Sequence, residues 1–260
     1  MFDALINRRI DTMGYNFSVE LADIDGLNRM AIHGTQEITK ISFNAFSLFS
    51  NEYQLLRSGS AIGFENGPLI ISKRKIYIDE LSQIKIAIPG NNTTANLLLI
   101  RLFPTVKNKH SYLFSDIETA ILDNEVDAGV IIHETRFTYQ KRGLQQIVDL
   151  GEEWNKQTKL PLPLGGIAIK RHLPTKIKEE IQLLIKQSVM YAMKHPNEAY
   201  QYVKQHAQEL DDDVIRKHIE LYVNEYSIWH TDICEKGIRN LLNIASEINH
   251  IIPVEPLFVS

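Results

Sequence analysis

Cysteine is almost missing from this chain of 260 residues, in which Cys234 stands alone. A single thiol excludes an internal disulfide and a thiolate metal cluster, so we expect Cys234 to serve packing. The nine histidines show no His-x-x-x-His spacing, and we expect no metal site. Walker, Gly-x-Gly-x-x-Gly and Gly-x-Ser-x-Gly motifs are also missing, which argues against nucleotide cofactors and serine hydrolysis.

An excess of charge of one sign is missing as well. The chain has 28 basic and 32 acidic residues, spread along its length, and a formal net charge of -4. This balance gives no electrostatic footprint for nucleic acid or an anionic membrane. No uncharged apolar run approaches the roughly 20 residues that span a bilayer, and the first residues do not resemble a signal peptide. We therefore expect a cytoplasmic protein without nucleic-acid or membrane partners; its oligomeric state is open, a homodimer included.

Segments with helical and strand periodicity alternate along the chain, which is typical of α/β proteins with parallel pairing. Beyond residue 174 only helices are expected, and one apolar stripe is formed by Ile177, Ile181, Leu184, Ile185, Val189 and Ala192. The expected strands are residues 17–22, 37–41, 68–73, 84–88, 111–114, 128–133, 146–150 and 165–170. Besides the helix with this stripe, the expected helices are residues 2–10, 25–33, 42–50, 93–103, 117–124, 197–207, 213–226 and 234–249.

The order of these segments predicts two lobes joined by a hinge, with a cleft between them. A polar stretch at residues 73–82 separates a first α/β unit from a second, and the strand at 165–170 returns to the first. We expect residues 1–80 and 170–260 to form the first, discontinuous lobe with its C-terminal helices. Residues 81–169 would form the inserted second lobe. Ligands in such folds bind at strand ends, where helix N-termini expose free N–H groups.

Two strand-to-helix turns are candidate ligand sites. Ser42 ends a strand and begins a helix, so its hydroxyl and the nearby amides could bind an oxygen of a ligand. Serine is also among the commonest helix N-caps, and that use needs no ligand. After Pro89-Gly90, Thr93 and Thr94 open the next helix with hydroxyls and unpaired amides that suit a carboxylate. A capped helix without a ligand is again the alternative.

His133 is the first candidate for a catalytic base. It ends a buried apolar strand beside the expected cleft, whereas an arbitrary histidine would more often be a core residue with satisfied nitrogens. Imidazole has an unperturbed pKa near 6.5, so a partly buried ring is largely neutral at pH 7 and can accept a proton. Glu134 would face the other side of an extended strand, so we do not pair it with His133. Arg136 could clamp a substrate, but a surface ion pair is the stronger interpretation.

Ordered matches along nearly the whole chain carry a family resemblance. The matching runs are Thr39-Lys40-Ile41-Ser42, Leu56-Arg57-Ser58-Gly59, Gly67-Pro68-Leu69, Pro89-Gly90 with Thr93-Thr94-Ala95, Ile131-Ile132-His133-Glu134 with Arg136-Phe137-Thr138-Tyr139, Val148-Asp149-Leu150-Gly151, Leu160-Pro161-Leu162-Pro163-Leu164-Gly165, and helical segments at 188–196, 206–210 and 222–224. They resemble the 1,4-dihydroxy-6-naphthoate synthases of the futalosine route to menaquinone, which look like cytoplasmic relatives of periplasmic binding proteins.

This resemblance implies an α/β periplasmic-binding-protein type II-like fold and a carbon–carbon lyase. Its substrate would be cyclic dehypoxanthine futalosine, its product the carboxylate 1,4-dihydroxy-6-naphthoate, and no cofactor would be needed. His133 matches the family's proposed proton acceptor. The family's substrate contacts match Lys40, Ile41, Ser42, Thr94 and Ala95.

One departure concerns the N-terminal side. Family members begin with a strand and a Ser-x-Cys-Pro-Asn-Asp-like turn before the helix that corresponds to residues 1–10, and this sequence has neither. Without that strand, the first sheet should lack a member near its centre and leave backbone groups unpaired. We expect Met1 to be an internal methionine of a longer protein.

Three other functions compete with the lyase. A chorismate-dehydrating enzyme of the same pathway would share the architecture, but the His-Glu-Thr-Arg-Phe-Thr-Tyr run at residues 133–139 favours the naphthoate synthases. A solute-binding protein would share the hinged fold and bind without turnover. A ligand-sensing domain of a transcription regulator would need a DNA-binding module that this sequence does not contain.

Overall fold

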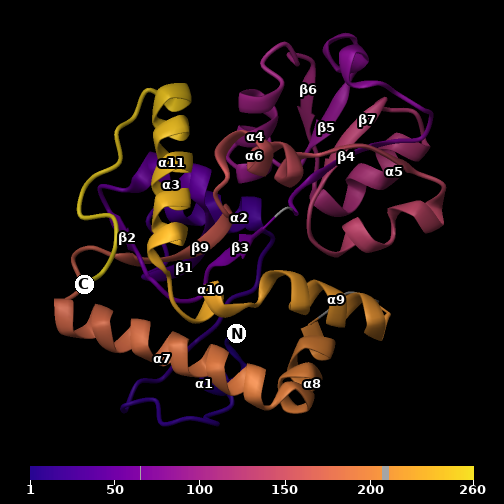
Figure 1. Cartoon of the computed structure of the whole chain (residues 1–260). Helices are drawn as coiled ribbons and strands as arrows, with labels where there is room; N and C mark the ends of the chain where they lie inside the picture. Colours follow the sequence, from indigo (N-terminus) through magenta and orange to yellow (C-terminus); the bar gives the residue numbers. More distant parts are fainter. Residues whose placement is uncertain (65, 207–210) are drawn as a thin grey trace.

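The computed structural model describes residues 1–64, 66–206 and 211–260, and its strands form two sheets (Figure 1). The first sheet has β9 (Leu162–Lys170) at its centre, paired with β1 (Ile38–Ser42), β2 (Tyr53–Leu55) and β3 (Ala61–Gly63). The second has the order β6 (Lys109–Ser111), β5 (Ile86–Ile88), β7 (Ala128–Ile131), β4 (Leu69–Ser72) and β8 (Gln145–Asp149).

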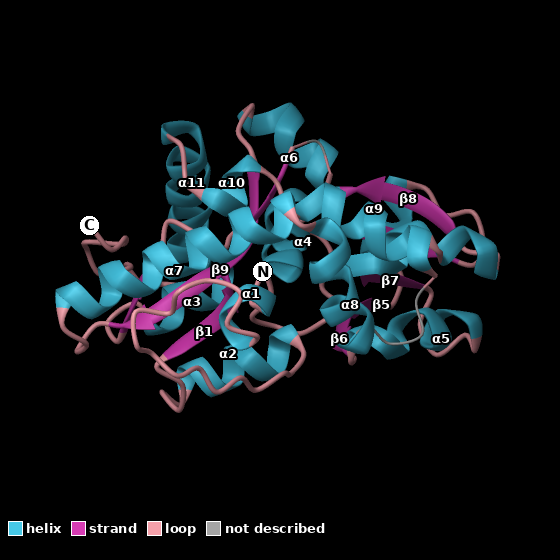
Figure 2. Cartoon of the chain, turned by 90° about the horizontal axis from the view of Figure 1, so that it is seen from below, coloured by secondary structure: helices cyan, strands magenta, loops and turns pink. Residues whose placement is uncertain are grey.

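Helices cover both sheets, and the helices between residues 175 and 222 form an arm that reaches from the first sheet toward the second (Figures 1 and 2). The α-helices are α1 (Asp3–Ile6), α2 (Ile24–Ile32), α3 (Phe43–Phe49), α4 (Thr94–Leu102), α5 (Ile117–Leu122), α6 (Leu150–Thr158), α7 (Thr175–Lys194), α8 (Pro196–His206), α9 (Asp212–Tyr222), α10 (Glu225–Ile228) and α11 (Asp232–Asn249). Short 3-10 helices are η1 (Ile78–Gln83), η2 (Phe114–Asp116), η3 (His133–Phe137) and η4 (Tyr139–Arg142). Residues 207–210, which belong to an expected helix and to a matching segment, lie outside the described residues.

The first sheet is antiparallel. Strands β1, β2 and β3 all pair antiparallel with β9. They therefore run in the same direction as one another, and β9 runs opposite to them and supplies their hydrogen-bond partner. In the second sheet β5 is parallel to β6 and β7, whereas β4 is antiparallel to β7 and β8.

The chain crosses between the sheets earlier than the sequence suggested. Strand β4, expected in the first lobe because a polar stretch follows it, pairs only within the second sheet, and β9 already belongs to the first sheet from Leu162. Boundaries at residues 80 and 170 are therefore wrong for these two strands. We propose that the lobes divide between Gly63 and Leu69 and again between Thr158 and Leu162.

Two glycines make the first crossing tight. A β-carbon on Gly67 would lie 2.7 Å from the backbone nitrogen of Gly151, and one on Gly151 would lie 2.4 Å from that of Gly67. Only hydrogen fits where these two backbones touch, so the crossing segment packs directly on the start of α6.

The expected strand at residues 17–22 is not formed. These residues have no regular secondary structure, and a cavity of about 280 Å³ lies between them and β1. Phe17, Leu21, Ile38 and Ile181 are among the residues that line it. Because β1 ends the described sheet on this side, its outer edge has no neighbouring strand there.

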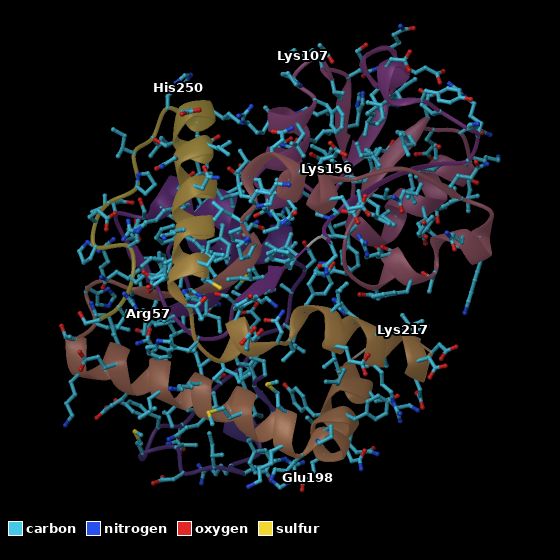
Figure 3. All side chains as sticks on the ribbon, viewed as in Figure 1. Arg57, Lys107, Lys156, Glu198, Lys217 and His250 are labelled. Atoms are coloured by element: carbon cyan, nitrogen blue, oxygen red, sulfur yellow. The ribbon has the colours of Figure 1, made fainter. Side chains whose placement is uncertain are left out.

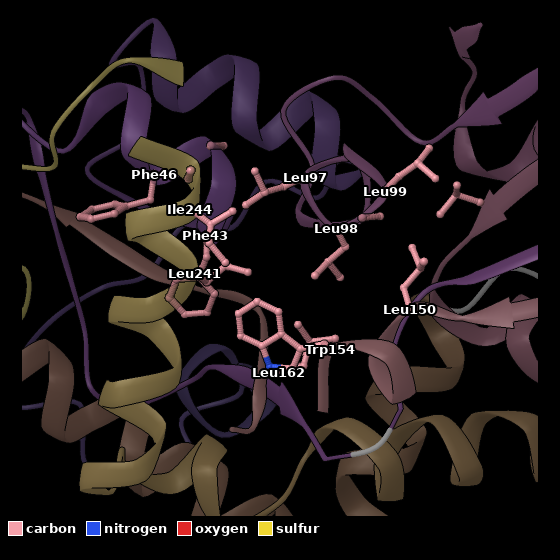
Figure 4. Close-up of a cluster of buried hydrophobic side chains, with 14 of the residues drawn as sticks. Phe43, Phe46, Leu97, Leu98, Leu99, Leu150, Trp154, Leu162, Leu241 and Ile244 are labelled. Carbon is pink, nitrogen blue, oxygen red and sulfur yellow. The ribbon is translucent and has the colours of Figure 1, made fainter. Parts of the chain in front are cut away.

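A continuous apolar core joins the helices to the first sheet and reaches the second. Phe43, Leu98 and Leu241 meet Trp154 in its centre (Figure 4), where the indole N–H donates to the carbonyl of Leu160 at 3.0 Å. The apolar stripe of α7 is confirmed for its four central residues, Ile181, Leu184, Ile185 and Val189, which are buried, whereas Ile177 and Ala192 at its ends are partly buried.

Charged side chains are spread over the periphery of both lobes, as Lys107, Lys156 and Lys217 illustrate (Figure 3). Within the described ranges, no helix combines the length and apolar character needed to cross a membrane.

Candidate active site

A cavity of about 130 Å³ lies where strand ends of both sheets meet. One strand pairing positions each wall. In the first sheet Ser42 lies opposite Gly165, and both line the cavity. In the second sheet Leu69 lies opposite Ile131, and their neighbours Pro68 and Ile132 line it. The residues that line it are Ile24, Lys40, Ser42, Ala61, Pro68, Thr93, Thr94, Ala95, Ile132, His133, Leu164, Gly165, His218 and Tyr222. The sequence predicted five of these as site residues.

Ser42 is held by a residue that the sequence did not indicate. The Asn28 side chain, fully buried on α2, accepts from the Ser42 backbone N–H at 2.9 Å and donates to the Ser42 hydroxyl oxygen at 3.0 Å. The hydroxyl makes no capping bond to α3. Its own proton is therefore available to a ligand, which favours the binding interpretation of Ser42 over the cap.

The start of α4 presents backbone amides rather than free hydroxyls. Thr93 caps the helix by accepting from the Asn96 N–H at 3.2 Å, and the Thr94 hydroxyl donates to the carbonyl of Leu164 at 2.8 Å. Among the residues that the structure describes, the backbone N–H groups of Thr94 and Ala95 have no acceptor. Such a helix start attracts an anionic oxygen.

Lys40 adds a positive charge to the cavity. No carboxylate in the described part of the chain pairs with its ammonium group, and burial lowers the pKa of Lys40. Ile41, the next residue, is fully buried in the core and does not line the cavity. Only the Ile41 backbone could therefore take part in the substrate contact that the family resemblance implies.

His133 begins η3, directly after the strand that was expected to carry it. Strand β7 ends at Ile131, and His133 has a left-handed backbone with φ +61°. A non-glycine residue in this conformation costs free energy, and such strained residues cluster at active sites as well as in turns. The turn also brings Glu134 to the same side as His133, because the backbone is not extended as the sequence suggested.

The imidazole of His133 is neutral at pH 7. Burial, with smaller contributions from His218 and from the positive charge of Lys40, lowers its pKa to about 3. Its ring centroid lies 5.1 Å from that of Phe114 and 6.1 Å from that of His218. An uncharged ring with a free nitrogen lone pair in a cavity can accept a proton from a bound molecule.

Helix α9 brings two further aromatic residues to the cavity that the sequence did not indicate. His218 and Tyr222 lie one helical turn apart with ring centroids separated by 5.1 Å. Burial lowers the pKa of His218 to about 4 and raises that of Tyr222 to about 12, so both are neutral. Their spacing of four residues, which puts both on one helix face, is the signal that could have suggested them.

One group of side chains in the described residues could hold a metal ion: His133, Glu134 and His218, whose ligand atoms lie within 4.8 Å of one another. The sequence could not show this group, because His218 is distant from the other two along the chain. Lys40 lowers the pKa of both imidazoles and so places a like charge beside any cation bound there. The absence of a metal ion remains a prediction.

Arg136 is an anchor of η3 and does not line the cavity. Its guanidinium group donates to the Asp149 carboxylate at 2.5 Å and to the Gly67 carbonyl at 2.7 Å. Asp149 also caps α6 by accepting from the backbone N–H of Gly151 at 2.7 Å. The expected ion pair is thus present but largely buried, and it ties η3 to the crossing between the sheets.

Comparisons with known proteins agree with this architecture. A model described as menaquinone biosynthesis matches residues 1–247. A 1,4-dihydroxy-6-naphthoate synthase from Thermus thermophilus is 38% identical over 247 residues, which cover 95% of this chain and 88% of that relative.

Solved structures share the fold. Protein AF1704 from Archaeoglobus fulgidus superimposes with a TM-score of 0.90 at 34% identity, covering 96% of this chain and 93% of that one. The alkanesulfonate-binding protein SsuA from Xanthomonas axonopodis pv. citri reaches a TM-score of 0.70 at 12% identity, covering 92% and 86%, and shows the fold alone. The expected periplasmic-binding-protein-like α/β fold is confirmed, and the chain belongs to the menaquinone biosynthesis family.

Proposed function

We propose that this protein is a lyase that converts cyclic dehypoxanthine futalosine to 1,4-dihydroxy-6-naphthoate. The observation that carries the proposal is the neutral ring of His133 in a cavity that also contains the unpaired ammonium group of Lys40. A proton acceptor and an anion-binding group in one cavity suit a reaction that removes a proton from a carboxylate substrate.

The substrate carboxylate would bind between Lys40 and the start of α4. The free N–H groups of Thr94 and Ala95 and the Ser42 hydroxyl can donate to its oxygens. Removal of a proton by His133 would let the sugar-derived fragment leave while the second ring becomes aromatic. This step is not a net oxidation or reduction, and it requires no redox cofactor.

General base catalysis typically accelerates a reaction by about 10² to 10⁴. The remaining acceleration must come from positioning the substrate and excluding water between the lobes. The cavity suits this, because most of its lining residues are apolar or already hydrogen-bonded within the protein.

The test is to incubate the protein with cyclic dehypoxanthine futalosine and to follow the dihydroxynaphthoate by absorbance. We expect product from the native protein and none from His133→Asn. Chorismate is the matched control substrate, and its dehydration would instead support the chorismate dehydratase. Tight binding of the futalosine derivative without product from either substrate would favour a solute-binding protein.

A further inference from the structure

His218 reaches the cavity from the opposite lobe to His133. It lies on α9, within the arm of C-terminal helices that follows the first sheet, whereas His133 begins η3 after a strand of the second sheet. Helix α9 packs against η3, and the two imidazole centroids are 6.1 Å apart. The two rings are therefore neighbours in the cavity wall, and a molecule that contacts His133 can also reach His218.

Glu134 gives the His218 ring an orientation. One carboxylate oxygen of Glu134 lies 3.9 Å from His218 Nδ1, and the side chains are only 20% and 30% exposed. This distance is longer than a hydrogen bond, but the negative charge lies beside Nδ1 and favours the tautomer that carries its proton there. The other nitrogen, Nε2, then has a lone pair and can accept a hydrogen bond, and burial keeps the ring uncharged.

We propose that His218 contacts the substrate by accepting a hydrogen bond at Nε2 from a hydroxyl group of the sugar-derived part, and that Glu134 is its positioning residue. This inference rests on the proposed function and deepens it. The carboxylate end binds at Lys40 and α4, and the hydroxyl-bearing end lies against the wall that the two histidines form. An acceptor in a buried cavity discriminates strongly against a ligand that lacks the matching hydroxyl.

The comparison of substrate with product provides the test, because the product has lost the sugar-derived part. Dissociation constants for both would be measured by calorimetry with His133→Asn protein, in which the substrate is not consumed. Adding His218→Phe keeps a ring of similar size and removes the acceptor. We expect the substrate to bind at least tenfold more weakly and the product to change by less than threefold.

Equal weakening of substrate and product binding would overturn the proposal, because His218 would then only shape the site. Unchanged binding of both would also overturn it, because His218 would then lie outside the site. If His218→Phe does not fold, His218→Leu serves the same comparison. Failure of the proposed function is a separate outcome, since it would appear as absence of product from the native protein whatever the effect of His218.

The role of Glu134 has its own readout. Glu134→Gln keeps the side-chain shape and removes the charge, so the nitrogen NMR shifts of the His218 ring should move toward a mixture of tautomers. Substrate binding should weaken about three- to tenfold. Glu220→Gln is the matched control, because Glu220 lies on the same helix as His218 but is exposed. An unchanged His218 spectrum in Glu134→Gln would show that Glu134 does not position the ring.

Discussion

Asn28 binds Ser42 at two points, accepting from its backbone N–H at 2.9 Å and donating to its hydroxyl oxygen at 3.0 Å. The second bond occupies a lone pair of the hydroxyl and leaves its proton free. A buried asparagine thus turns a serine at a helix start into a hydrogen-bond donor aimed at the cavity.

Ser42→Ala should weaken substrate binding about two- to tenfold, because one net hydrogen bond contributes about 0.5–1.5 kcal/mol. Asn28→Ala should weaken it as well and also lower the free energy of unfolding by about 1–3 kcal/mol, since the buried Ser42 N–H loses its acceptor. Calorimetry and thermal unfolding measure the two effects. Ser115→Ala, at an exposed serine, is the control. Unchanged affinity in Ser42→Ala would show that the hydroxyl does not reach the substrate.

His133→Asn should reduce kcat by at least about 10² while the protein stays folded. Asparagine is the better replacement because it tolerates the left-handed backbone of His133, with φ +61°, whereas alanine adds strain there. Turnover and circular dichroism would be compared with the native protein. Retained turnover would remove His133 as the base.

Lys40→Met should weaken substrate binding without lowering the stability of the protein. Removing an unpaired, partly buried charge whose pKa is lowered by desolvation should leave the melting temperature unchanged or raise it. Loss of a charged hydrogen bond worth about 1.5–3 kcal/mol should weaken substrate binding at least about tenfold. Lys40 lowers the pKa of His133, so its removal should raise that pKa. The fall of kcat/KM at acid pH should then begin at a higher pH. Lys107→Met is the exposed control, and equal effects in both variants would contradict the assignment.

Acid should destabilise the protein partly through its buried histidines. The pKa of His133 is about 3 and that of His218 about 4 in the folded state, against about 6.5 when unfolded. Between these values the unfolded chain binds the additional protons, so stability falls as the pH drops below about 6.5. Over this acid range the His133→Asn variant should lose less stability than the native protein, with a difference of up to about 1.4 kcal/mol per pH unit. Urea unfolding at pH 7 and pH 5 would test this, and identical losses would contradict it.

Asp149→Ala should be among the most destabilising substitutions near the cavity. It leaves the guanidinium group of Arg136 unpaired and removes the cap of α6, for which we expect a cost of about 3–5 kcal/mol. Glu153→Ala breaks a solvent-exposed pair with Lys156 on the same helix and should cost less than about 1 kcal/mol. Similar melting temperatures for the two variants would show that the Arg136 anchor contributes little.

Most helices and strands and the segments around the cavity were predictable from the sequence, because each depends on neighbours along the chain. Strands β2 and β3 and helix α6 were not predicted, and the expected strand at 17–22 is not formed. Periodicity identified α7, and polar residues at helix starts identified Ser42 and Thr94. The end of an apolar run identified His133 to within two residues of the end of β7.

Contacts between distant segments were not predictable in this way. Nothing local to residues 69–72 indicates that β4 pairs in the second sheet, because a polar stretch after a strand is compatible with either sheet. From the sequence, Asn28 is only one residue of an expected helix, and its contact with Ser42 depends on how that helix packs. His218 lies on a polar helix whose position depends on packing against η3.

The contact between Gly67 and Gly151 makes the passage from one sheet to the other intolerant of any side chain. The carbonyl of Gly67 also receives a hydrogen bond from Arg136, three residues after His133. A single methyl group added to either glycine would displace that carbonyl, and the helical turn bearing the proposed base would shift with it. Damage to catalysis can therefore begin at two positions that contribute no functional group to the cavity.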